Sequence, residues 1–227
     1  MYSVKFFKGN YSERQKAAND AKCIAYIEHH FNSAEFPKAN YAMVVVSLNS
    51  SPKSRDWGRD YVRRIVEEFG VGSGGDGGLV IGGFDGRGDR NLNKTKMPAI
   101  LVEPLFGSNS AHADWIRSDE GQMRLARVLT NSIQHAFPEG GLIGFSVGHK
   151  YKISRPNDRG ADVVGGGTEA DCAEQVLLKA QKLLEALSSP TVRKIRIFSG
   201  SDMLYEIAVD KNTVTSWNPE EDILRIS

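Results

Sequence analysis

The chain has 227 residues, of which 40% are hydrophobic and 25% are charged. A chain of this length and composition can bury a hydrophobic core without disulfide bonds, which excludes disordered and fibrous proteins. Lysine and arginine total 29 against 28 aspartate and glutamate residues, so the formal net charge is +1. This balance gives no strong positive field for nucleic acid or an acidic membrane, so we expect a small substrate site and no nucleic-acid partner.

Four helices are predicted from the spacing of apolar residues. One begins at Ser12, and two more cover about 54–69 and about 118–136, where apolar residues recur every three or four positions. The fourth begins at Thr168, whose hydroxyl group can cap a helix, and its apolar face extends to Leu187. This spacing places the apolar side chains on one face of each helix, where they can be buried against a sheet.

Short apolar runs rich in β-branched residues lie between these helices and predict strands that are buried on both faces. The runs are Ile24–Ile27, Tyr41–Val46, Pro98–Val102, Leu142–Val147 and Val192–Phe198. Alternating strands and helices predict an α/β fold with a largely parallel central sheet flanked by helices. In such a sheet, the binding crevice lies beyond the carboxyl ends of the strands.

Two segments depart from this alternation. Residues 70–90 are rich in glycine and predict a surface loop with a short strand at Leu79–Ile81, a candidate wall or lid over a substrate. From about residue 190 the pattern changes to strands joined by turns, one of them at Asp210–Asn212. This change predicts a C-terminal β-rich extension.

Nothing in the sequence indicates export or a membrane anchor. Cys23 and Cys172 are the only cysteines, and we interpret both as packing residues rather than as a disulfide. The N-terminal residues lack the pattern of a signal peptide, and no run of about 18 apolar residues is present. We therefore expect synthesis in the cytoplasm without a signal peptide, and no stable membrane insertion.

Residues typical of metal sites follow the predicted strands. His30 follows the first strand, Glu103 the third and His149 the fourth, while Glu169 opens the last helix. Taken singly, a histidine at a strand end is more often structural, and a glutamate at a helix N-terminus is favoured there by the helix dipole. Convergence at one sheet edge favours a site instead, because two histidines and one glutamate form a known set of catalytic zinc ligands.

The motifs that carry these residues resemble those of the zinc-dependent N-acetylmuramoyl-L-alanine amidases, the amidase type 3 family. The first half of the family pattern is matched by Gly148-His149, Asp158–Ala161 and Glu169. The second half is matched by Arg14 with Ala18-Asn19, by Ile27–Ser33 and by Met97–Asn109. Glu28 stands where the family has serine. In the family the two halves occur in the opposite order, so the resemblance implies a circular permutation joined near Pro138–Gly141.

The resemblance also implies the chemistry of the site. His30, His149 and Glu169 would bind Zn²⁺, which would activate a water molecule and polarise the substrate carbonyl group. Glu103 would be the catalytic base that takes the proton of the water and passes it to the leaving amine.

Further implications concern substrate contacts and domains. Asn32 would contact the substrate, and His112 lies close enough to Glu103 in the sequence to do so as well. Residues 1–190 would form the circularly permuted amidase catalytic domain. Residues 191–227 would form an extension that completes this domain or is appended to it.

The implied activity is hydrolysis of the amide bond between N-acetylmuramic acid and L-alanine in peptidoglycan. Such a protein would be a phage endolysin or a delivered lytic effector, with a holin or an injection apparatus as delivery partner, and would act on the bacterial cell wall after release. Two alternatives stay open. One is a zinc carboxypeptidase-like peptidase, although its usual His-x-x-Glu is absent where Lys150–Lys152 follow His149. The other is a non-catalytic peptidoglycan-binding module, which would need neither the metal ligands nor Glu103.

Overall fold

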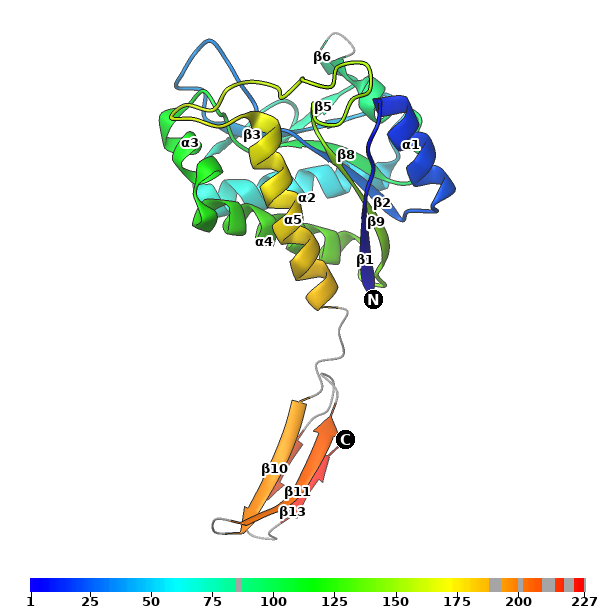
Figure 1. Ribbon diagram of the computed structural model, residues 1–227, viewed down its shortest axis with the longest axis vertical. Coiled ribbons are helices and arrows are strands. Elements are labelled where there is room, and N and C mark those ends of the chain that lie inside the picture. The colour runs from blue at the N-terminus through cyan, green and yellow to red at the C-terminus, as the bar shows by residue number, and fades with distance from the viewer. Residues whose placement is uncertain (85–86, 188–192, 200–201, 210–214, 219–222, 227) are drawn as a thin grey trace. The chain divides into compact units, whose positions relative to one another are not determined.

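The computed structural model (Figure 1) describes residues 1–84, 87–187, 193–199, 202–209, 215–218 and 223–226. The chain divides into two compact units, Met1–Ala186 and Leu187–Ser227. The first unit contains every residue that the sequence predicts for the site.

The described residues of the first unit form five α-helices, one 3-10 helix and nine strands. The helices are α1 (Tyr11–Asp20), α2 (Pro52–Phe69), α3 (Ser110–Arg117), α4 (Asp119–Ala136) and α5 (Glu169–Ala186), with the 3-10 helix at Asp89–Asn91. The strands are β1 (Tyr2–Phe6), β2 (Ala25–His29), β3 (Tyr41–Val46), β4 (Gly72–Ser73), β5 (Leu79–Ile81), β6 (Gly83–Phe84), β7 (Arg87–Gly88), β8 (Ala99–Glu103) and β9 (Gly141–Val147).

Seven strands form one largely parallel sheet in the order β1-β9-β2-β8-β3-β4, with β5 also paired to β3. The strands β1, β9, β2 and β8 are parallel to one another, whereas β3 is antiparallel to β8. Both β4 and β5 pair in parallel with β3. The predicted α/β fold, with a largely parallel sheet flanked by helices, is therefore confirmed.

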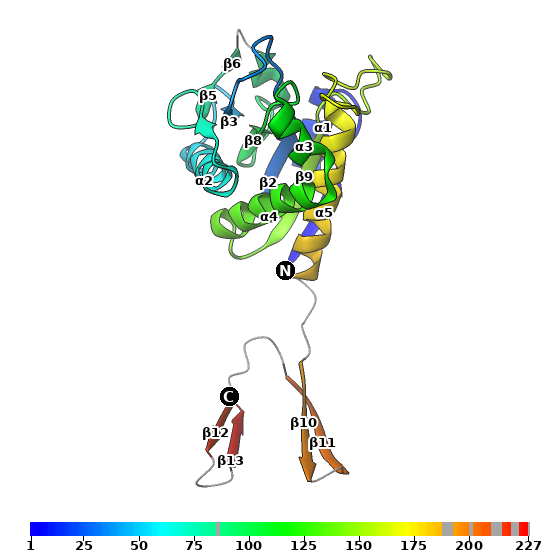
Figure 2. The ribbon, with the colours of Figure 1, turned by 90° about the vertical axis from the view of Figure 1, so that its left-hand side faces the viewer.

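Side chains along each strand alternate between the two faces of the sheet. On β2, Ala25 and Ile27 belong to a large core that also includes side chains of α2, α4 and α5. Tyr26 belongs to a smaller core on the other face, with Ala18 of α1. Figure 2 shows α4 in front of the strands on the larger core's side. Burying one large aliphatic side chain contributes about 1.5–3 kcal/mol, so these two cores hold the helices on the sheet.

The helix ends follow from the local sequence. Ser118 caps α4 by accepting a hydrogen bond from a backbone amide in its first turn. Ser51 caps α2 in the same way, and Pro52 occupies the first helical position, where no amide hydrogen is needed. Gly70 ends α2 in the left-handed conformation, with a φ angle of 68°.

The strand β1 and the helix α3 are among the elements that the sequence pattern does not predict. The strand β1 is five residues long and lies at the edge of the sheet. The helix α3 has eight residues, and its start is fixed by Asn109, whose side chain accepts hydrogen bonds from the amides of Ala111 and His112. Both elements are too short for a hydrophobic period to show. By contrast, the short strand predicted at Leu79–Ile81 is present as β5.

The described residues of the second unit form two antiparallel hairpins. In the first, β10 (Arg193–Ser199) pairs with β11 (Asp202–Val209). In the second, β12 (Thr215–Asn218) pairs with β13 (Ile223–Ile226). The predicted turn at Asp210–Asn212 lies outside the described residues. Over the described parts of both units, no helix combines the length and apolar character needed to cross a membrane.

Candidate metal centre

The carboxyl ends of β9, β2 and β8 lie side by side at one edge of the sheet. The last residue of β2 is aligned with Val147 of β9 and with Val102 of β8. The hydrogen bonds between these strands continue one residue further. The Gly148 amide donates to the carbonyl oxygen of His29, and the His30 amide donates to the carbonyl oxygen of Val102, both at 2.9 Å. Residues from three separate strands are thereby brought to the same edge.

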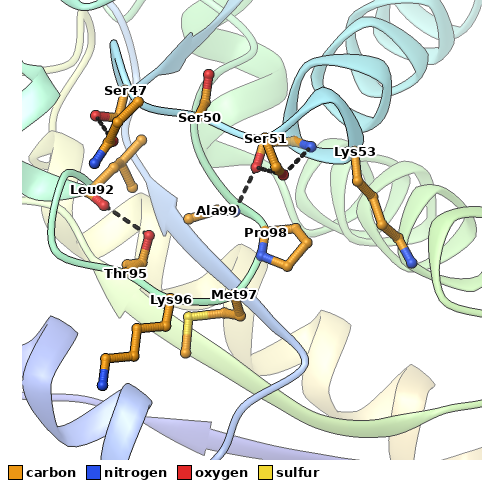
Figure 3. Close-up of a pocket in the computed structure, with 12 residues that line it drawn as sticks. Ser47, Ser50, Ser51, Lys53, Leu92, Thr95, Lys96, Met97, Pro98 and Ala99 are labelled. Carbon is orange, nitrogen blue, oxygen red and sulfur yellow. Dashed lines mark hydrogen bonds between the residues drawn. The ribbon is translucent and has the colours of Figure 1, made fainter.

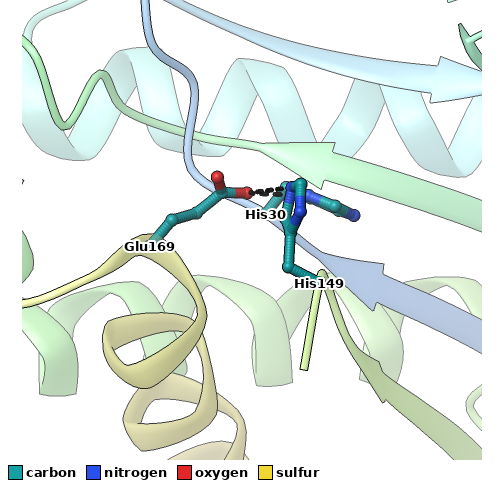
Figure 4. A group of neighbouring side chains, drawn as sticks. All are labelled: His30, His149 and Glu169. Carbon is teal, nitrogen blue, oxygen red and sulfur yellow. Dashed lines mark hydrogen bonds and ion pairs between the residues drawn. The ribbon is translucent and has the colours of Figure 1, made fainter. Parts of the chain in front are cut away.

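His30, His149 and Glu169 form a cluster at this edge (Figure 4). One ligand atom from each residue lies within 4.8 Å of the others. The Oε1 atom of Glu169 is 2.7 Å from Nδ1 of His30 and 3.5 Å from Nε2 of His149. Two imidazole nitrogens and a carboxylate oxygen are donors that zinc prefers, so the residues present fit a zinc ion.

Two glycines allow the cluster to be this tight. A Cβ atom on Gly148 would lie 2.4 Å from Cε1 of the His30 ring, so the backbone contacts that ring directly. A Cβ atom on Gly160 would lie 2.3 Å from Oε2 of Glu169, and Gly160 also has a φ angle of 72°. His149 itself adopts a positive φ of 61°. These contacts explain why the Gly-His and Asp-x-Gly-Ala motifs contain glycine.

Glu169 is held by backbone as well as by the histidines. It lies in the first turn of α5 and is buried, and its Oε2 atom accepts a hydrogen bond from the Ala161 amide at 3.1 Å. Burial acts to raise the pKa of Glu169, but the hydrogen bond and charge of His30 lower it overall. The carboxylate is therefore kept ionised and aimed at both histidines.

Each histidine of the cluster contacts a second carboxylate through its other ring nitrogen. Nδ1 of His149 lies 2.9 Å from Oδ1 of Asp158, and Nε2 of His30 lies 2.8 Å from Oε1 of Glu28. Burial acts to lower the pKa of His30, but its hydrogen bonds with Glu169 and Glu28 raise it to about 10. Sequence reasoning did not assign Glu28 a role, although its position two residues before His30 on a strand indicates the same face.

A cavity of about 820 Å³ opens beside the cluster. It is lined by His30 and His149, and also by Glu103 and Asn32. Aromatic and basic side chains complete much of the wall: Tyr11, Tyr41, Phe84, Phe106, Arg90, Lys152 and Arg155. The structure therefore brings five of the six predicted site residues to one region, since Glu169 belongs to the cluster.

His112, the sixth, has a different position. Its side chain is buried, Nδ1 accepts a hydrogen bond from the Phe106 amide at 3.0 Å, and Nε2 lies 2.9 Å from Oδ1 of Asn40. It is not among the residues that line the 820 Å³ cavity. His112 thus holds the loop that supplies Phe106 to the cavity.

His29 is separated from the cluster by the alternation of β2. It is fully buried and makes an edge-to-face contact with Phe31, with ring centroids 5.0 Å apart. Neither of its ring nitrogens has a hydrogen-bond partner in the described part of the chain. Burial lowers the pKa of His29 to about 3, so this imidazole is neutral near pH 7. Both cysteines are buried and form no disulfide.

A second cavity, of about 340 Å³, lies at the opposite end of β8 (Figure 3). Its wall includes Ser51 and Ser54 at the start of α2. The Ser54 hydroxyl oxygen accepts a hydrogen bond from the Ala99 amide at 3.1 Å, and the Ser51 hydroxyl caps α2. These groups hold the helix on the sheet, and none of the predicted site residues lines this cavity.

Solved amidase structures resemble part of the chain. The catalytic domain of CwlV, an N-acetylmuramoyl-L-alanine amidase from Bacillus (Paenibacillus) polymyxa var. colistinus, has 20% identity and a TM-score of 0.47, over 57% of this chain and 66% of that one. An N-acetylmuramyl-L-alanine amidase from Mycobacterium smegmatis has 20% identity and a TM-score of 0.48, over 57% and 61%. One from Clostridium difficile has 17% identity and a TM-score of 0.49, over 58% and 67%. The match spans less than two thirds of the first two solved chains.

The sequence itself matches one family. A family model described as N-acetylmuramoyl-L-alanine amidase matches residues 4–135, which is more than half of the chain. The matched stretch contains His30 and Glu103, whereas His149 and Glu169 lie beyond it. Among curated proteins, none matches the chain. The chain belongs to the N-acetylmuramoyl-L-alanine amidase family.

Proposed function

We propose that this protein is a zinc-dependent amidase that hydrolyses the bond between N-acetylmuramic acid and the L-alanine of the stem peptide in peptidoglycan. The observation that carries the proposal is the cluster of His30, His149 and Glu169 beside a cavity that also contains Glu103. Membership of the amidase family supports this substrate class.

His30, His149 and Glu169 would hold the zinc ion. Three protein ligands of this kind leave a further coordination position for water or substrate. Zinc at such a site polarises a carbonyl group and lowers the pKa of water. The burial of His30 and Glu169 excludes bulk water from the ligands, which strengthens electrostatic interactions at the site.

Glu103 would move the proton. It ends β8 and lines the cavity together with His30 and His149. A carboxylate oxygen of Glu103 would take a proton from the attacking water as the new C–O bond forms. The same group would deliver that proton to the amide nitrogen as the C–N bond breaks, giving a lactyl carboxylate and a free L-alanine amine. General acid and base catalysis of this kind contributes about 10²–10⁴ in rate.

Other residues would orient the substrate. Asn32 lines the cavity, and its buried amide nitrogen has no hydrogen-bond partner in the described part of the chain, so we assign it a hydrogen bond to a substrate carbonyl. His112 would act indirectly, by holding Phe106 in the wall. Phe84 and Gly88 bring the glycine-rich segment to the cavity, which supports its role as a wall over the stem peptide.

We also propose that the chain is circularly permuted relative to its family. The strands β9 and β1 are parallel neighbours, and α5 packs on both. Figures 1 and 2 both place the N-terminus beside the carboxyl end of α5. A link from Ala186 to Met1 would therefore restore a continuous β9-α5-β1 unit. The proposed join is a tight turn, in which the Gly140 amide donates to the Phe137 carbonyl oxygen at 3.0 Å.

The permutation is tested by rejoining the chain. A variant that begins at Gly141, links Ala186 to Met1 through a glycine and serine linker, and ends at Phe137 should fold and bind zinc with the same stoichiometry. The control is the original order ending at Ala186. A rejoined chain that stays unfolded while the control folds would contradict the proposal.

We further propose that the protein reaches the wall as a phage endolysin or as an injected effector. Expression in a bacterium with and without an added export signal tests this route. Lysis is expected when the protein is exported or when a holin is supplied. Lysis by the cytoplasmic protein alone would contradict dependence on delivery.

The enzymatic proposal is tested by digesting purified peptidoglycan and identifying the cleaved bond by mass spectrometry, with zinc content measured in parallel. We expect stem peptides that begin with a free L-alanine amine, no products after treatment with a chelator, and recovery when zinc is restored. Release of a C-terminal residue alone would indicate a peptidase. Peptidoglycan binding without any product would indicate a binding module.

A further inference from the structure

We infer that Glu28 is a positioning residue that fixes the ring orientation and tautomer of His30 for metal binding. The inference rests on the proposed zinc function. It concerns a feature of this chain, because Glu28 stands where the family motif has serine.

The contacts of Glu28 are those of a buried acceptor. Its side chain is fully buried, and Oε1 lies 2.8 Å from Nε2 of His30. Asn91 donates to the same oxygen at 2.6 Å, and the Ser146 hydroxyl donates to Oε2 at 3.0 Å. An ionised carboxylate can only accept hydrogen bonds, so this arrangement requires the proton of His30 to be on Nε2.

Both ring nitrogens of His30 face carboxylates, but a metal bound between His30 and Glu169 would take the place of a proton on Nδ1, whereas Nε2 would keep its proton for Glu28. Nδ1 is the atom that faces Glu169, at 2.7 Å. Gly148 lies against the same ring and restricts its movement. Carboxylate partners of metal-binding histidines orient the ring and raise the basicity of the ligand nitrogen. Serine at position 28 would have a shorter, uncharged side chain and could not make this contact in the same way.

A buried cation sits behind Glu28. Arg14 is fully buried, and it donates to the Ser146 hydroxyl oxygen at 2.8 Å and to the carbonyl oxygens of Gly9 and Val147, at 2.7 and 2.8 Å. Among the described residues Arg14 forms no ion pair with a carboxylate, and the Ser146 hydroxyl connects it to Glu28. Glu28 could therefore act merely as the counter-charge of Arg14, and the experiment must separate the two roles.

Two substitutions separate them. Glu28→Ser removes the partner of His30, whereas Ser146→Ala breaks the link to Arg14 and leaves the pair of Glu28 and His30 in place. Zinc affinity is measured on the full chain by competition with a chromophoric chelator, and stability is measured on the zinc-free proteins. We expect Glu28→Ser to weaken zinc binding by about 10- to 100-fold, with Glu28→Gln intermediate. Ser146→Ala should lower stability with zinc affinity unchanged within a few fold.

Asp60→Asn is the matched control, because it removes a carboxylate that accepts hydrogen bonds from two arginines on α2, away from the cluster. It should leave zinc affinity unchanged. Equal losses of zinc affinity in Glu28→Ser and Ser146→Ala would overturn the inference, because they would show that Glu28 serves only as the counter-charge of Arg14.

A spectroscopic measurement on the wild-type chain tests the tautomer of His30 directly, even where a variant does not fold. Long-range ¹H–¹⁵N NMR of the zinc-loaded wild-type chain should show the His30 proton on Nε2 and the metal on Nδ1. The reverse assignment would overturn the inference. If the wild-type protein binds zinc and Glu28→Ser binds it with the same affinity, the inference alone is overturned. If the wild-type protein binds no zinc, the proposed function is overturned as well.

Discussion

Glu103 and Glu169 are both glutamates at the ends of elements, but the structure gives them different surroundings. Glu169 is buried between two histidines and a backbone amide, whereas Glu103 is half-buried and lines the cavity. This contrast supports one role as a ligand and one as the proton carrier.

We predict that Glu169→Ala strips zinc, because it removes one of three protein ligands, together with the stability that the metal contributes. Glu103→Gln keeps the shape of the side chain but cannot accept a proton. It should therefore retain zinc near one equivalent and lower turnover by at least about 10². Zinc analysis and peptidoglycan hydrolysis measured on the same samples check both expectations. Equal zinc loss in the two variants would make Glu103 a ligand too.

Gly148 should tolerate no side chain. In Gly148→Ala the new Cβ would lie 2.4 Å from the His30 ring, so the ring must leave its present position in the cluster. We predict a loss of zinc affinity and a loss of about 1–3 kcal/mol in the free energy of unfolding, as for other overpacked sites. Gly70→Ala is the control, because its Cβ would meet nothing within 4 Å although φ is 68°. That control should lose about 1–2 kcal/mol from backbone strain with zinc affinity unchanged.

At the scale of elements, α2 carries a local charge network. Asp60 accepts hydrogen bonds from Arg63 at 2.8 Å and from Arg64 at 2.7 Å. Burial acts to raise the pKa of Asp60, but the hydrogen bonds of the two arginines lower it overall. A carboxyl group with a lowered folded-state pKa stabilises the protein above its ordinary pKa of about 3.9, and this stabilisation is lost as the pH falls through the folded-state value.

We therefore predict that Asp60→Asn lowers the free energy of unfolding by up to about 1 kcal/mol at pH 7, because the network is partly exposed. The difference from wild type should shrink below about pH 4. Chemical denaturation of the zinc-free proteins between pH 3 and pH 7 measures this difference in the free energy of unfolding. A difference that grows as the pH falls would contradict this account.

At the scale of the whole molecule, all residues proposed for catalysis lie in the unit Met1–Ala186, which has its own cores. We keep the proposal that residues 1–190 are the catalytic domain and 191–227 an extension. Deleting residues 188–227 should therefore preserve folding and zinc stoichiometry, and should alter solubility or wall targeting instead. Thermal unfolding and zinc analysis check this. A folded truncation that has lost its zinc would show that the extension completes the site.

Much of the architecture followed from local sequence. Apolar runs and helical spacing predicted α2, α4, α5 and the central strands, because each of these elements is long enough to show its own period or is buried on both faces. The short elements β1 and α3 were missed, because five and eight residues carry little periodic signal. Their existence depends on neighbours: β1 needs β9 as a pairing partner, and α3 needs the cap at Asn109.

The sequence by itself determined which residue types stand at the ends of the strands, and the order of motifs that places His30 and Glu103 before His149 and Glu169. Alternation along β2 also separated His30 from His29, since neighbouring side chains on a strand point to opposite faces. Only the tertiary structure decided that Glu28 and Asp158 are the partners of the two histidines, and that His112 holds a loop. Each of these contacts is local in the chain, but the two rings are oriented by the cluster, which joins His30 to Glu169 across 139 residues. That distance is set by the register of three strands and by the close approach of Gly148 and Gly160, which pack segments far apart in the chain against one another.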